Sequence, residues 1–138
     1  MRKRYVILAA CLALLLCGIT WGLYLYNKPH ANVARQSPSF RMDAADLGGE
    51  YRRDEAGSNR KFIDKVIEVK GTISDQQQTD STASIQLDTG DPGSSVNCSF
   101  LLTGQAKMNL PPKGSQVTIK GRCAGMLIDV NLVDCVME

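Results

Sequence analysis

Three cysteines, Cys98, Cys123 and Cys135, stand out as chemically distinctive residues beyond the apolar N-terminal stretch. Three thiols permit one disulfide and leave one cysteine over. His30 is the only histidine, it lies far from these cysteines in sequence, and no Cys-x-x-Cys spacing occurs. A Cys/His zinc site and a Cys–His nucleophile pair are therefore not predicted, and we expect no metal and no cofactor.

The tripeptide Asp88-Thr89-Gly90 could also do chemistry, because aspartic proteases use two such carboxylates that share a proton. This chain has one copy, so that reaction would require a symmetric dimer. Asp88 and Asp91 could offer oxygens to Ca²⁺, but two carboxylates are few for an ion that takes six to eight oxygens. The segment 88–93 is rich in residues that turns select, and we interpret it as a turn between two strands.

The net charge argues against nucleic acid as a partner. The chain has 16 basic and 14 acidic residues, and without Arg2, Lys3 and Arg4 it has 13 basic and 14 acidic residues. The rest of the chain is therefore nearly neutral and lacks the basic footprint that supplies most nucleic-acid affinity.

The N-terminus predicts a membrane anchor. Residues 1–4 form a basic flank, and residues 5–26 are uncharged and free of proline. A helix of that length reaches about 33 Å, enough for a hydrocarbon core of about 30 Å. Because basic residues concentrate before the segment, we expect the N-terminus on the cytoplasmic side of the cell inner membrane and residues 27–138 on the opposite side.

Two alternatives to an uncleaved anchor share the same start. Leu8-Ala9-Ala10-Cys11 resembles a lipobox, which would make the protein a lipoprotein anchored at Cys11, although the apolar run continues well beyond that cysteine. The second alternative is a cleaved signal peptide, which has an apolar region shorter than residues 5–26 and a small-residue cleavage site.

The exported part divides into a linker, 27–42, and a domain, 43–138. Pro29 and Pro38 mark the linker. A short helix is predicted from Asp43 to about Arg53, with Asp43 as its cap and Leu47 and Tyr51 on one face. A polar stretch through Asn59 is predicted to end it.

Five segments show the alternation of half-buried strands. In the last of them Ile128, Val130 and Leu132 are predicted to point inward. A short helical connection near 104–110 is predicted between the third strand segment and the fourth. The predicted strands are 66–73, 83–87, 96–102, 116–123 and 127–136.

Three strands, a connection and two strands is the order of the OB-fold, a five-stranded Greek-key barrel. OB barrels bind ligands across their second and third strands, whose outward residues here would form a polar, uncharged face without aromatic rings. Stacking rings and a positive groove are what single-stranded nucleic acid requires. The candidate ligand face is Ser84, Gln86, Asn97 and Ser99.

Strand geometry favours one cysteine pairing. A hairpin turning around Gly125 and Met126 would leave Cys135 seven residues beyond the partner of Cys123, too far for a bridge between these two. Because the third and fifth OB strands run parallel, Cys98 would lie near the end of the strand that finishes at Cys123. Cys98–Cys123 is the preferred bridge, with Cys135 free; three buried thiols that act as small hydrophobes remain the alternative.

Several segments resemble the tRNA-anticodon-binding-domain-like (tRNA_anti-like) OB family, over about residues 43–138. The resemblance implies an OB-fold and a small bacterial membrane-anchored or lipoprotein-like protein; Gly48-Gly49 departs from the more helical segment expected there. The segments are FIDKVIEVKGTI (62–73), VNCSF (96–100), KG (113–114), VTIKGRCAG (117–125) and DVNLVDC (129–135).

From these patterns we expect an all-β domain with minor α content that acts as a non-enzymatic binding module of the cell envelope. Its partner would be a protein or a polar glycan, and residues 5–26 would hold it to the membrane. A nucleic-acid-binding OB domain and an enzyme that uses Asp88 or Cys98 are the alternatives. The sequence does not indicate an oligomeric state.

Overall fold

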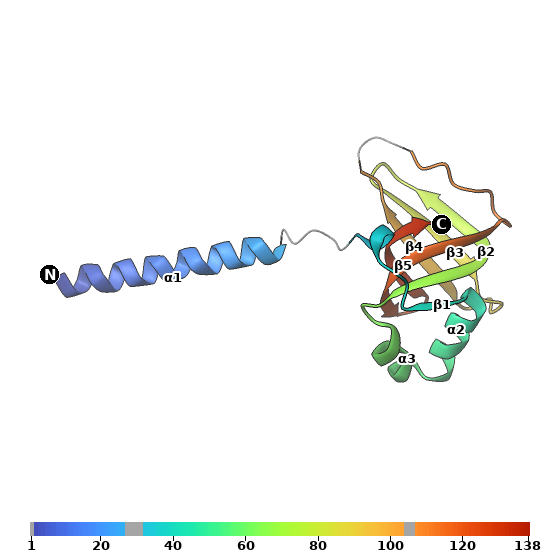
Figure 1. Cartoon of the computed structure of the whole chain (residues 1–138), viewed down its shortest axis with the longest axis horizontal. Helices are drawn as coiled ribbons and strands as arrows, with labels where there is room; N and C mark the ends of the chain where they lie inside the picture. Colours follow the sequence, from blue (N-terminus) through green and yellow to red (C-terminus); the bar gives the residue numbers. More distant parts are fainter. Residues whose placement is uncertain (1, 27–31, 104–106) are drawn as a thin grey trace. The chain divides into compact units, whose positions relative to one another are not determined.

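The computed structural model describes residues 2–26, 32–103 and 107–138. The chain divides into two compact units, Met1–Ala31 and Asn32–Glu138. In the first, α1 (Arg2–Tyr26) is a continuous helix that includes the predicted membrane segment (Figure 1). Its span Lys3–Tyr26 has a mean hydropathy of 2.4, so α1 is long and apolar enough to cross a membrane.

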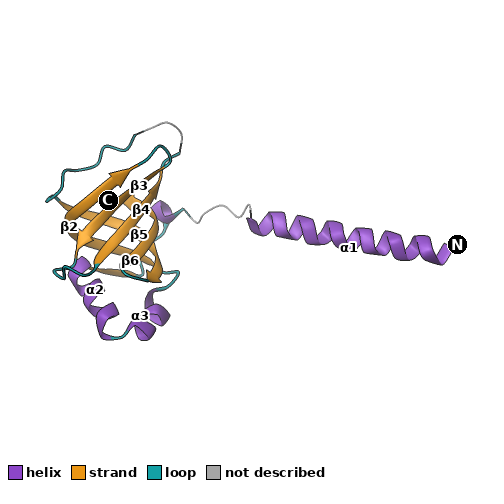
Figure 2. Ribbon diagram, turned by 180° about the vertical axis from the view of Figure 1, so that it is seen from behind, coloured by secondary structure: helices purple, strands orange, loops and turns teal. Residues whose placement is uncertain are grey.

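The second unit is built on a closed five-stranded barrel (Figure 2). Around the barrel the strands follow the order β2-β3-β4-β6-β5, and β5 pairs with β2 to close it. The pair β4–β6 is parallel and the other pairs of the barrel are antiparallel, so the predicted OB-fold is confirmed. The strands are β2 (Val66–Gln78), β3 (Thr82–Asp88), β4 (Ser95–Leu101), β5 (Gln116–Met126) and β6 (Val130–Met137).

A short strand, β1 (Phe40–Asp43), pairs in parallel with β2 outside the barrel. It begins within the segment 27–42 that was expected to be a linker. The 3₁₀ turn η1 (Val33–Arg35) also belongs to this unit: Val33 is buried, and Lys120 Nζ donates to Ala34 O at 3.3 Å. β1 is not predicted from sequence, because its four residues are too few for a strand pattern to be recognised.

Two helices cover one end of the barrel, α2 (Ala44–Arg53) and α3 (Glu55–Phe62) (Figure 2). Leu47 and Tyr51 of α2 are buried, as their spacing predicted. The second helix is not predicted from sequence, because its residues through Asn59 form the expected polar stretch and EAGSNRKF contributes only Phe62 to the core. Tertiary packing of that one ring against Tyr51 holds the helix in place; the ring centroids are 5.9 Å apart.

Most inward residues of the barrel strands follow the predicted alternation, and Ile128 is an exception. Ile128, expected to point inward, is 75% exposed, because it lies in the turn between β5 and β6. Residues 107–110 have no helix where a helical connection near 104–110 was expected; 104–106 lie outside the described residues. The buried barrel residues include Ile67, Val69, Ile73, Ala83, Ile85, Leu87, Val96, Cys98, Phe100, Ile119, Cys123, Val130 and Leu132.

Asp54 caps α3, whereas Asp43 does not cap α2 with its side chain. Asp54 Oδ1 accepts from Gly57 N at 2.9 Å, and no side-chain cap hydrogen bond forms at Asp43. We expect Asp54→Ala to lower the free energy of unfolding by about 1 kcal/mol. The matched Asp43→Ala should change it by less than about 0.5 kcal/mol. Calorimetric unfolding of the two variants checks this; equal losses would contradict the capping assignment.

The two adjacent glycines of α2 should respond oppositely to alanine. A Cβ at Gly48 would lie 2.8 Å from Cγ2 of the buried Thr89, whereas a Cβ at Gly49 would meet only Arg52 Nη2, at 4.0 Å. We expect Gly49→Ala to stabilise the domain by about 0.5–1 kcal/mol through helix propensity. We expect Gly48→Ala to destabilise it by about 1–3 kcal/mol through overpacking. Denaturant midpoints measure both, and a stabilising Gly48→Ala would refute the close approach.

Candidate ligand-binding face

The four residues predicted as a ligand face do share one side of the barrel. Ser84 of β3 lies opposite Ser99 of β4, and Gln86 lies opposite Asn97. Their neighbours in each strand are buried, because successive side chains of a strand point to opposite faces. All four are half-buried. They form a continuous strip of hydroxyl and amide groups.

A fifth residue, Asn131 of β6, extends this strip across the parallel strand pair. Asn131 is in register with Asn97, and Asn97 Nδ2 donates to Asn131 Oδ1 at 3.2 Å. Asn131 also donates from its own Nδ2 to Asp129 O at 2.9 Å. Its outward position follows from strand alternation, but its place beside Asn97 depends on tertiary pairing. We refer to Ser84, Gln86, Asn97, Ser99 and Asn131 as the polar face.

A shallow pocket of about 540 Å³ adjoins the polar face at Gln86. It is formed by Ser74 of β2, the loop between β3 and β4, and Asp129 from the loop between β5 and β6. None of the described residues that line it is basic or aromatic. It offers hydroxyl, amide and carboxylate groups, which suit hydrogen bonds to polar groups and do not suit phosphate.

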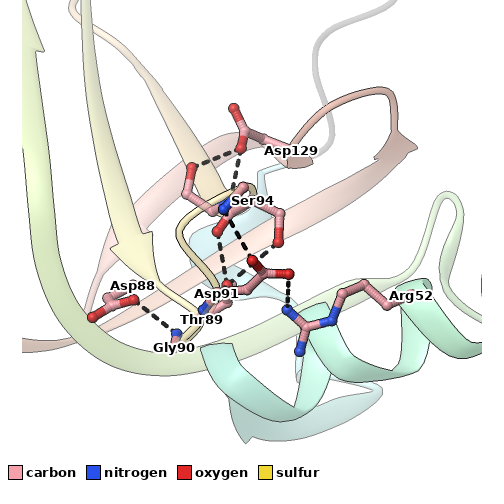
Figure 3. A network of polar contacts seen from close by, with 9 residues as sticks. Arg52, Asp88, Thr89, Gly90, Asp91, Ser94 and Asp129 are labelled. Carbon is pink, nitrogen blue, oxygen red and sulfur yellow. Dashed lines mark hydrogen bonds and ion pairs between the residues drawn. The ribbon is translucent and has the colours of Figure 1, made fainter.

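The loop between β3 and β4 is held by its own side chains, as Figure 3 shows. Asp88 Oδ1 accepts from Gly90 N at 2.7 Å, and Thr89 Oγ1 donates to Ser94 O at 2.7 Å. Asp91 Oδ1 accepts from Gly93 N at 3.0 Å. These are the local bonds of a turn, so the interpretation of 88–93 as a turn is confirmed.

Two further contacts attach this loop to other elements (Figure 3). Arg52 of α2 donates from Nη1 to Asp91 Oδ2 at 2.6 Å. Asp129 Oδ1 accepts from Ser95 N at 2.7 Å and from Ser95 Oγ at 2.9 Å. The loop between β3 and β4, which forms the rim of the pocket, is therefore joined to α2 on one side and to the turn between β5 and β6 on the other.

The carboxylates of the pocket are occupied by structural bonds. The hydrogen bond from Gly93 N and the one from Arg52 lower the pKa of Asp91 below its usual value, which keeps it ionised. Within residues 2–26, 32–103 and 107–138, no three His, Cys, Asp or Glu side chains are grouped so that they could hold a metal ion. His30 lies outside the described residues.

The three domain cysteines are buried and separate into two environments. The Tyr51 hydroxyl and the Cys123 Sγ are 3.3 Å apart, and burial followed by this contact raises the pKa of Tyr51. Interaction with the Cys135 side chain, followed by burial, raises the pKa of the Cys98 thiol well above its usual value. All three are free thiols in this structure.

Strand register speaks against the expected Cys98–Cys123 bridge. Leu132 of β6 pairs with Cys98 on one side and with Cys123 on the other. The two cysteines are thus two strand spacings apart, about 10 Å. A bridge requires Cα atoms within about 7 Å. The parallel pairing of β4 with β6 was predicted, but its register could not be.

One solved structure agrees with this architecture. A crystal structure from Klebsiella pneumoniae, described as a "putative nucleic acid-binding lipoprotein", superposes with a TM-score of 0.59 at 16% identity, over 72% of this chain and 92% of that chain. A second structure, described as a "putative aspartyl-tRNA synthetase" from Leishmania major, has a TM-score of 0.45 at 12% identity, over 80% of this chain and 22% of that chain. No match was found among curated proteins. Residues 1–137 match the tRNA_anti-like family, and the chain therefore belongs to the tRNA_anti-like family.

Proposed function

We propose that this protein is a non-enzymatic binding module of the bacterial cell envelope, which binds a protein or a polar glycan through the polar face and its adjoining pocket. The observation that carries the proposal is the chemistry of this surface. Half-buried serine, asparagine and glutamine side chains run across three strands and end at a pocket rimmed by backbone and carboxylate groups. Such groups select polar partners by hydrogen bonds.

The position of the surface in the fold supports a binding role. OB barrels bind ligands over the strands that correspond here to β3 and β4, and over the loops that follow β2 and β5. The polar face occupies the first of these regions, and Asp129 comes from the second loop. The fold points to this region as a binding surface, and the side chains present there indicate the class of ligand.

Nucleic acid is the weaker candidate, although the Klebsiella protein is described as binding it. Asp88, Asp91 and Asp129 lie at the pocket, and Arg52, the cation beside it, is paired with Asp91. A phosphate backbone would meet carboxylates and would find no stacking ring on the polar face.

α1 and the basic residues at its start support an envelope location. Arg2, Lys3 and Arg4 precede a span that can cross a membrane, and positive residues favour the cytoplasmic side. The barrel unit would then lie outside the cytoplasm of a single-pass inner-membrane protein. Anchoring through a lipid at Cys11 would place the same barrel in the envelope.

Site-specific photo-crosslinking in intact cells tests the binding surface. We expect a crosslinker at Ser99, on the polar face, to capture a protein or glycan that mass spectrometry identifies. The matched control is Lys70, which is exposed on β2 beside β1 and β5. Equal capture from the two positions would refute the proposed surface. Adducts at Ser99 that disappear on nuclease treatment would support the nucleic-acid alternative instead.

The mass of the protein recovered from membranes tests the form of the anchor. We expect the intact chain of 15.0 kDa. A mass that lacks residues 1–10 and carries lipid would establish Cys11 as the attachment point. A reporter fused after Glu138 tests sidedness, and activity of a cytoplasm-dependent reporter would rule out export.

A further inference from the structure

Two aliphatic side chains, Leu127 and Ile128, stand out from the turn between β5 and β6, and we refer to them as the apolar turn. Leu127 is 91% exposed and Ile128 is 75% exposed. In the described part of the barrel unit only two other large apolar side chains are exposed, Ile63 at 39% and Leu101 at 56%. Ile63 borders the same turn, because its Cδ1 would lie 3.4 Å from a Cβ at Gly125. Exposed aliphatic groups that gather at one place indicate a contact surface, whereas single ones do not.

Polar bonds fix the base of the apolar turn and thereby hold its tip in place. Asp129 Oδ1 accepts from Ser95 N and from Ser95 Oγ, which ties the turn to the start of β4. Leu127 N donates to Asp129 O at 3.3 Å, and Asn131 Nδ2 donates to the same oxygen at 2.9 Å. A group that is already positioned loses less freedom when a partner covers it.

The apolar turn protrudes, so it cannot form a small-molecule site by itself. Sites for small ligands are concave and enclose most of the ligand, whereas Leu127 is exposed over nine-tenths of its surface. A protruding aliphatic pair suits the opposite role, as an anchor that enters an apolar socket on another macromolecule. The apolar turn is also continuous with the proposed binding surface, because the next residue, Asp129, lines the pocket.

The charge beside the apolar turn favours a protein over a lipid bilayer as its partner. Asp129 lines the pocket together with Asp88 and Asp91. In the described part of the chain Asp91 is paired with Arg52, whereas Asp88 and Asp129 form no ion pair. Surfaces that bind bilayers carry Lys and Arg beside their apolar groups, because anionic lipids attract them. On the other side of the turn the exposed charges next to Ile63 are mixed in sign: Arg60, Asp64 and Lys65.

We propose that the apolar turn is the anchor by which this chain binds another protein of the envelope, one that offers an apolar socket with a basic residue at its rim. The socket takes Leu127 and Ile128, and the basic rim lies over the carboxylates of the pocket. Opposite charges at the edge of an interface speed the encounter and fix its register. Because it names the partner of the binding surface and chooses protein over glycan, this assignment rests on the proposed function.

Photo-crosslinking with the full chain in intact cells tests this contact. A crosslinker at Leu127 should capture one protein, and a crosslinker at Ser99 of the polar face should capture the same one. Lys70 on β2 is again the control position. Capture of the same proteins from Leu127 and Lys70 overturns the proposal. Adducts at Leu127 that contain only lipid, only glycan or only a second copy of this chain overturn it as well.

A matched pair of double variants tests the socket through the crosslink at Ser99. Leu127→Ser with Ile128→Ser should lower the yield of captured protein about tenfold, the scale of losing an interface anchor. Leu127→Ile with Ile128→Leu keeps the apolar area and should keep the yield. Both variants should unfold at the wild-type temperature, because the two side chains are exposed. An undiminished yield from the serine variant contradicts the role of the apolar turn.

Asp88→Asn tests the basic rim independently of the apolar turn. Asn retains a side-chain oxygen that can accept from Gly90 N, so the loop keeps its bond while the charge is lost. The yield of captured protein at Ser99 should fall about threefold, the scale of an exposed ion pair. An unchanged yield refutes the basic rim.

The results at Ser99 and Leu127 distinguish a failure of this assignment from a failure of the proposed function. A glycan captured at Ser99, or a protein whose capture the serine variant does not reduce, refutes the anchor and leaves the binding module intact. Equal capture at Ser99 and Lys70, with one protein still captured at Leu127, refutes the polar face and supports the apolar turn. No specific capture at Ser99 or Leu127 refutes both.

Discussion

The parallel pairing of β4 with β6 joins the β2-β3-β4 side of the barrel to the β5–β6 pair, and the features of functional interest depend on it. It brings together two strands that are separated in sequence by the connection 102–115 and by all of β5. It places Asn97 beside Asn131 and thereby extends the polar face to a third strand. The same pairing brings Ser95 to Asp129, which joins two loops at the rim of the pocket. A parallel contact of this kind is short and non-local, so its neighbours must hold it in register.

α2 contributes to the binding surface because it contacts the loop between β3 and β4. Gly48 lets α2 approach Thr89 closely, and Arg52 reaches Asp91. Together with the turn bonds of Asp88 and Thr89, these contacts hold the loop between β3 and β4 in one arrangement. The carboxylates that might have suggested catalysis or a metal therefore serve to shape a pocket. The close approach explains why Gly48 occurs in a helix that sequence propensity alone disfavours, whereas no such contact accounts for Gly49.

Charge distribution separates the two parts of the chain. Basic residues gather at the start of α1, while the barrel unit places three acidic residues, Asp88, Asp91 and Asp129, at the pocket. It also pairs several of its cations, as in Arg52–Asp91, Lys113–Asp75 and Arg122–Asp134. An OB-fold and a family name that refers to tRNA would otherwise favour nucleic acid as the ligand. The uncharged side chains on the polar face favour a partner that is recognised by hydrogen bonds between uncharged groups. Function depends on the surface that a fold carries and not on the fold alone.

The amino-acid sequence alone determined the apolar span, the five strands of the barrel and the side to which most of their residues point. These follow from composition and from a period of two, which are local properties that a single chain segment displays. It did not reveal β1, whose four residues gain order by pairing with β2, or α3, which depends on the burial of Phe62. Tertiary structure alone decided that Cys135 enters the core and that Asn131 joins the polar face. Both depend on strand register and on the left-handed residue Asp134, and a shift of one residue reverses which side chains enter the core.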